Sequence, residues 1–89
     1  MTTLFVRHTV GDYATWRRIF DDFAPTHQAL GVTDKAVYHA TDNANDITVS
    51  NQFVPLEAAK AFAGSPELKA AMHDAGVTSA PTIWFTTRA

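Results

Sequence analysis

The chain has 89 residues, a length that predicts a single domain covering residues 1–89. Its formal net charge is −2, with seven basic and nine acidic residues scattered along the sequence, which argues against the concentrated positive face of a nucleic-acid-binding protein. The absence of cysteine excludes thiol chemistry and disulfides, and no apolar run approaches the ~20 residues of a membrane helix. Because residues 1–8 lack the pattern of a secretory signal, we expect a cytoplasmic protein.

The first part of the chain predicts a strand that leads directly into an aromatic helix. Residues 3–9 are rich in β-branched and aromatic side chains, Gly11 breaks the strand, and Asp12 is the expected N-cap. Aromatic and apolar side chains then recur every three or four residues, as on one face of a helix; they are Tyr13, Trp16, Phe20, Phe23, His27 and Leu30. Pro25 predicts a kink or a restart of this helix, and Gly31 its end.

The remaining elements are expected as a strand over 33–41, a turn at 42–46, a strand over 46–54, a helix over 56–63, a helical restart from 65 until Gly76, and a strand over 82–87. The two middle strands and their turn form a hairpin. In the restart, Ser65 is the expected N-cap and Pro66 occupies the one helical position where proline is favoured.

The order β-α-β-β-α-β predicts a ferredoxin-like α+β fold, in which two helical segments cover one face of an antiparallel four-stranded sheet. The other face still carries large apolar side chains such as Phe5 or Trp84. A second copy of the chain is the expected cover, so we expect a homodimer. The sequence leaves open which face carries Trp84 and Tyr38.

Two stretches, VRHTVGDYATWRRIFDDFAP and LEAAKAFAGSPELKAAMHDAGV, resemble small bacterial proteins of the dimeric α/β-barrel superfamily. They are similar to the antibiotic-biosynthesis-monooxygenase-like group, some members of which carry a cyclase label. The resemblance implies sheets paired back to back in a barrel, with a small pocket between each sheet and its helices. Oxygenases of this kind, which use no cofactor, typically have a histidine in the helix before the Ser-Pro restart, a region that here contains Phe62 and no histidine. Haem-degrading relatives use an asparagine on the first strand, and this strand has none.

Two residues are the catalytic candidates. His8 is in phase with Leu4 and Val6, which places it at the rim of the pocket, and its imidazole titrates near neutral pH. The alternative for His8 is a structural histidine at the junction between strand and helix. Asn51 is in phase with Ile47 on an apolar face, where an amide needs a partner, so it is the candidate polarising donor. Both side chains are expected to face the helices near Trp16.

The substrate-binding candidates are Trp16, Phe20, Tyr38 and His39. The first three would form flat apolar walls, although Trp16 and Phe20 are also core candidates at their helical spacing. His39 is expected at the same end of the sheet as His8. The spacing of His8, His39 and His73 along the sequence fits no metal-binding motif, so no metal is expected. His27, past Pro25, is expected to be a core or dimer-edge histidine.

Three functions remain open on these residues. The first is a cofactor-free enzyme that oxygenates, cyclises or isomerises an aromatic or polycyclic small molecule. The second is a non-catalytic small-ligand-binding or stress-accessory protein with the same pocket, and the third is a haem-handling protein. An enzyme should bring at least two titratable or donor groups within about 3 Å of a common point, whereas a binder needs only one.

Overall fold

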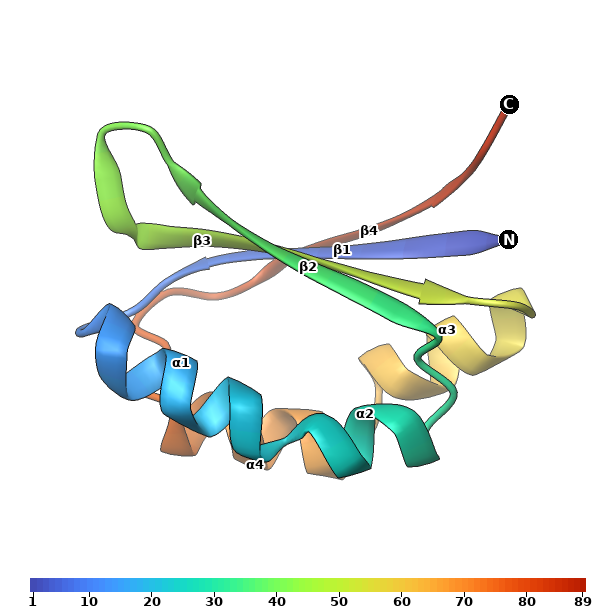
Figure 1. The fold of residues 1–89 in the computed structure, drawn as a ribbon, viewed down its shortest axis with the longest axis horizontal. Helices are drawn as coiled ribbons and strands as arrows, with labels where there is room; N and C mark the ends of the chain where they lie inside the picture. The colour runs from blue at the N-terminus through green and yellow to red at the C-terminus, as the bar shows by residue number, and fades with distance from the viewer.

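The computed structural model describes residues 1–89 and consists of one sheet with helices on one side (Figure 1). Its elements are β1 (Thr2–Thr9), α1 (Tyr13–Asp22), α2 (Ala24–Ala29), β2 (Asp34–Ala40), β3 (Asn43–Phe53), α3 (Leu56–Ala63), α4 (Pro66–Asp74) and β4 (Thr82–Thr87). The four strands are antiparallel to their neighbours in the order β2-β3-β1-β4. The predicted ferredoxin-like α+β fold is therefore confirmed.

Local signals in the sequence set the helix boundaries. The Asp12 carboxylate accepts a hydrogen bond from the backbone N–H of Thr15 at 3.0 Å, and the Ser65 hydroxyl accepts one from that of Leu68 at 3.2 Å. The first helix ends at Asp22 and restarts as α2 with Pro25 in its first turn. These two caps satisfy backbone donors that a helix leaves unpaired at its N-terminus, so α1 and α4 begin where the sequence predicted.

The β2–β3 hairpin differs from the prediction. The expected turn at 42–46 is shorter, since β3 already begins at Asn43 and a register shift lies between His39 and Ala40. Asn45 explains the difference: its backbone carbonyl accepts from Val10 at 2.9 Å and its side-chain oxygen from the backbone N–H of Tyr13 at 3.0 Å. These contacts with the β1–α1 junction hold residues 43–46 extended, although their composition is typical of a turn.

The register of the strands assigns each side chain to a face of the sheet. Leu4, Val6 and His8 face the helices, and Phe5 faces the opposite, open side. Phe5 is paired with Trp84, and their rings stack with centroids 5.2 Å apart, so Trp84 also lies on the open side. Successive side chains of a strand alternate between faces. The structure thus establishes which face of the sheet carries Trp84.

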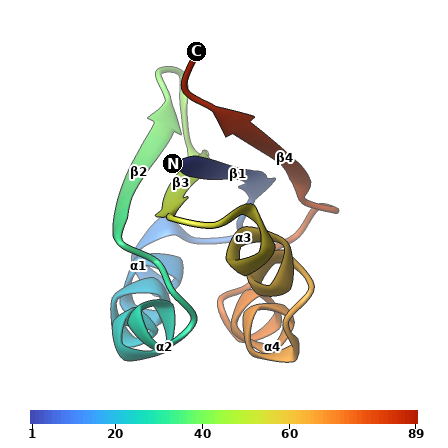
Figure 2. The ribbon, with the colours of Figure 1, turned by 90° about the vertical axis from the view of Figure 1, so that its right-hand side faces the viewer.

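Two rows of helices, α1–α2 and α3–α4, lie side by side beneath the sheet (Figure 2). The apolar core is correspondingly in two parts. One consists of Leu4, Val6, Phe53, Ala59 and Phe62, and the other of Val10, Trp16, Ile47, Val49 and Ala75. None of the helices combines the length and the apolar composition needed to cross a membrane.

Candidate functional site

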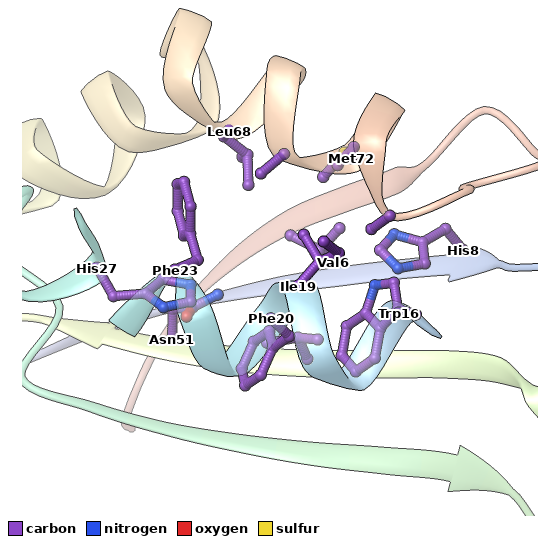
Figure 3. Close-up of a pocket in the computed structure, with 13 residues that line it drawn as sticks. Val6, His8, Trp16, Ile19, Phe20, Phe23, His27, Asn51, Leu68 and Met72 are labelled. Carbon is purple, nitrogen blue, oxygen red and sulfur yellow. The ribbon is translucent and has the colours of Figure 1, made fainter. Parts of the chain in front are cut away.

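A small cavity lies between the sheet and the two rows of helices (Figure 3). Its volume is about 50 Å³, and 10 of its 13 lining residues are hydrophobic. The three polar lining residues are His8, His27 and Asn51. A cavity of this size has room for a few water molecules, whereas ligand pockets usually measure about 300–1,000 Å³. An aromatic ligand therefore requires the helices to move apart.

His8 faces this cavity from β1, as the alternation of the strand predicted. The residue is 5% exposed, and its ring meets that of Trp16 edge-on with centroids 5.9 Å apart. Neither ring nitrogen has a hydrogen-bond partner in the protein. Burial lowers the pKa of His8, so the imidazole is neutral at pH 7. The hydrogen bond that a structural histidine would make at the strand–helix junction is therefore absent.

Asn51 faces the same cavity from β3, at the other end. It is 2% exposed, and its side-chain oxygen has no protein partner. Asn51 is paired with Leu4 on β1, whereas His8 is paired with Ile47 on β3. The position of Asn51 along the sheet is therefore four residues from that of His8. At a rise of about 3.4 Å per residue the separation along the strands is roughly 13 Å. Asn51 therefore shares the cavity with Trp16 but lies well away from His8 along the sheet.

Three aromatic residues of the first helical row line the cavity: Trp16, Phe20 and Phe23. The rings of Trp16 and Phe20 stack with centroids 4.9 Å apart, and Trp16 is 4% exposed whereas Phe20 is half-buried. Trp16 also belongs to the apolar core, so it serves both purposes that the helical spacing suggested. A planar ligand between the sheet and α1 would contact these two rings.

Tyr38 and His39 do not line the cavity. Tyr38 is paired with Thr48 on the open side of the sheet and is 55% exposed. His39 lies at the edge strand, where its Nδ1 donates to the carbonyl oxygen of Ala44 at 2.7 Å and its ring centroid is 4.4 Å from that of Tyr13. The prediction that these two residues contact a ligand in this cavity is wrong. A local sequence pattern does not show which side chains of β2 face the helices, nor that β2 is an edge strand.

Lys35 is the residue near the cavity that the sequence analysis missed, whereas His27 is buried in the core, one of the two places expected for it. His27, on α2, is 4% exposed and packs against the rings of Phe20, Phe23 and Phe62 at centroid distances of 5.1, 4.7 and 5.7 Å. Its Nδ1 is 3.1 Å from Nζ of Lys35. Burial, and then the positive charge of Lys35, lower the pKa of His27 to about 4. The place of His27 on the same apolar stripe as Trp16 agrees with this burial.

Histidines and carboxylates do not gather elsewhere in the structure. No group of three such side chains is placed to hold a metal ion. The polar groups that the fold brings together are those of the cavity. The imidazole of His8 lies at the Trp16 end, and the amide of Asn51 and the imidazole of His27 lie toward the other end, with Asn51 about 13 Å from His8 along the strands.

Comparisons with known proteins agree on the fold. No protein-family model and no curated protein sequence matches the chain. Among solved structures it is similar to SnoaB from Streptomyces nogalater, a cofactor-independent oxygenase, with 20% identity and a TM-score of 0.76 over 99% of this chain and 93% of that one. It is also similar to a candidate antibiotic biosynthesis monooxygenase from Bordetella bronchiseptica, with 11% identity and a TM-score of 0.85 over 99% and 96% of the two chains.

A third similar structure is the NE2512 protein of unknown function from Nitrosomonas europaea, with 21% identity and a TM-score of 0.75 over 96% of this chain and 85% of that one. The chain thus has the fold of the antibiotic-biosynthesis-monooxygenase-like proteins, as its sequence predicted. Likeness at this level of identity establishes the fold, and one fold supports many activities, so the activity has to be argued from the site.

Proposed function

We propose that this protein is a cofactor-independent oxygenase of an aromatic small molecule, with His8 as the proton acceptor. The observation that carries the proposal is that both ring nitrogens of His8 are unpaired in an apolar cavity beside Trp16. A neutral imidazole with a free lone pair is a suitable general base at pH 7. The fold shared with SnoaB, itself a cofactor-independent oxygenase, supports the same reaction class.

The reaction fits an aromatic methylene compound whose anion is stabilised by conjugation. His8 takes a proton from the activated carbon, and the electron-rich anion then reduces O₂. Over the whole reaction the methylene carbon loses two hydrogens and gains one oxygen atom, and the second oxygen atom leaves as water. The stacked rings of Trp16 and Phe20 would hold the planar anion and keep bulk water away from it.

The test uses anthrone as the probe substrate. O₂ uptake and the incorporation of isotopically labelled oxygen are measured for the wild type and for His8→Leu. We expect the variant to lose about 100- to 10,000-fold in rate, the usual contribution of a general base. Lys60→Met, which changes an exposed residue of α3, is the matched control. Equal rates in the wild type and His8→Leu would refute the role of His8.

We also propose that the chain functions as a homodimer joined through the open side of its sheet. That side carries the stacked pair of Phe5 and Trp84, with Tyr38 55% and Trp84 39% exposed. Exposed aromatic clusters on a sheet face are typical of interfaces. Sedimentation of the wild type should show a dimer at micromolar concentration, and Trp84→Asp should shift it towards monomer. A wild type that sediments as a stable monomer would contradict the proposal.

A non-catalytic ligand-binding protein is the second candidate, and the separation of the polar groups favours it. His8 and Asn51 lie about 13 Å apart and so do not converge on one reacting atom. Ligand binding without O₂ uptake would select this candidate. The haem-handling alternative required a histidine facing an open cleft, and the two histidines that line the cavity, His8 and His27, are only 5% and 4% exposed. We therefore do not propose it.

A further inference from the structure

The hydrogen bond between Lys35 and His27 determines which nitrogen of His27 carries the proton. A lysine ammonium group has donors only, so the Nδ1 atom 3.1 Å away must accept. The low pKa of His27 keeps the ring neutral at pH 7. A neutral imidazole that accepts at Nδ1 carries its proton at Nε2. His27 therefore has an N–H donor on the side of the ring away from Lys35, and the residue lines the cavity.

The strand register brings Asn51 to the same place. Lys35 on β2 and Asn51 on β3 are direct cross-strand partners, and such neighbours on one face have Cβ atoms about 4.5–5.5 Å apart. Figure 3 shows His27 and Asn51 toward the end of the cavity away from His8. The Asn51 oxygen is buried and has no protein partner. One donor and one acceptor thus line the end of the cavity opposite His8.

We propose that His27 and Asn51 form a recognition site for a hydroxyl group of the ligand, with Lys35 as a positioning residue. A hydroxyl group can accept from Nε2–H of His27 and donate to the Asn51 oxygen at once. A carbonyl oxygen could accept from His27, but it would leave the Asn51 acceptor unpaired. Because this inference builds on the proposed function, it narrows the substrate to an aromatic compound with a hydroxyl group at the end remote from His8.

Lys35 is the one charged side chain in contact with His27. The other neighbours of the ring are Phe20, Phe23 and Phe62. Nζ of Lys35 lies 5.0 Å from the centroid of Phe20. Burial lowers the pKa of Lys35, Asp21 acts to raise it and Arg17 to lower it. The ammonium group therefore sits over an aromatic ring with its hydrogen bond directed at His27, which is how it fixes the tautomer.

The first experiment reads the tautomer in the free protein by ¹⁵N NMR of the imidazole rings at neutral pH. We expect His27 to carry its proton at Nε2 in the wild type. Lys35→Met should produce a mixture of tautomers, whereas Lys35→Arg, which retains a charged donor, should restore the wild-type signal. Lys60→Met is the control and should change nothing. A wild-type ring protonated at Nδ1, or a signal unchanged in Lys35→Met, would overturn the role of Lys35.

The second experiment compares the binding of phenol with that of fluorobenzene, a probe of similar shape that lacks the hydroxyl donor. We expect the wild type to prefer phenol by about tenfold or more, since fluorobenzene would leave the buried acceptor unpaired. Asn51→Leu should remove the preference while retaining an apolar cavity. Equal affinities in the wild type, or no binding of phenol at millimolar concentration, would overturn the proposed site.

The two proposals fail in different ways. Oxygenation of anthrone with no preference for phenol would reject the hydroxyl site and leave the oxygenase function standing. A clear preference for phenol without O₂ uptake on any hydroxylated aromatic methylene compound would reject the oxygenase function and retain the site. The His27 tautomer is read without any ligand, so it tests the Lys35 contact independently of both.

Discussion

Acidification should destabilise the fold through His27. The unfolded chain takes up a proton at this residue near pH 6.5, whereas burial and Lys35 lower the pKa of the folded state to about 4. The folded protein thus binds fewer protons between these values. This contribution to stability is fully present above pH 6.5 and is lost as the pH falls towards 4. At 1.36 kcal/mol per pKa unit, the difference between 6.5 and about 4 corresponds to about 3 kcal/mol.

The assay is urea unfolding of the wild type and of His27→Phe between pH 7 and pH 4. A phenylalanine ring can occupy the site among Phe20, Phe23 and Phe62 without taking up a proton. The variant should therefore lose about 3 kcal/mol less than the wild type over this range. The pKa of His8 is also lowered by burial, but His8 is present in both proteins and its effect cancels in the difference.

Two further variants sharpen this measurement. Lys35→Met removes a positive charge that lowers the pKa of His27 but leaves the ring buried, so its acid-induced loss should lie between those of the wild type and His27→Phe. His73→Gln removes an exposed histidine and should behave as the wild type. If His27→Phe and the wild type show the same dependence on pH, the burial argument for His27 is wrong.

His8→Leu should leave the free energy of unfolding at pH 7 within about 1 kcal/mol of the wild type, because neither ring nitrogen is paired; a loss above about 2 kcal/mol in urea titration would reveal a missed hydrogen bond. Phe62→Ala should cost about 3–5 kcal/mol, since the ring is 1% exposed in the core, and a wild-type melting temperature would refute that packing. Gly31→Ala should lower the free energy of unfolding by about 1–2 kcal/mol, because the φ of Gly31 is +98°. Gly64→Ala should have no such cost, because the φ of Gly64 is −96°, and equal thermal stabilities of the two variants would contradict the assignment of strain.

The positions of single elements follow from local chemistry, so the sequence alone predicted them. Asp12 and Ser65 satisfy backbone donors within three residues of themselves, and Gly31 takes a backbone conformation that other residues adopt at a cost. The alternation along β1 likewise placed His8 on the helix-facing side. Each of these features depends on neighbours in the chain, and the order of elements then specified the ferredoxin-like arrangement.

The composition of the site was decided by contacts between distant segments. The register of β1 against β3 placed Asn51 about 13 Å from His8, and that of β2 against β3 placed Lys35 beside Asn51 and turned Tyr38 to the open side. The packing of α2 over this row then joined His27 to Lys35. A shift of one residue in either register would reverse the face of every side chain in a strand, and no local pattern specifies the register. Tertiary structure therefore determined which polar groups share the cavity.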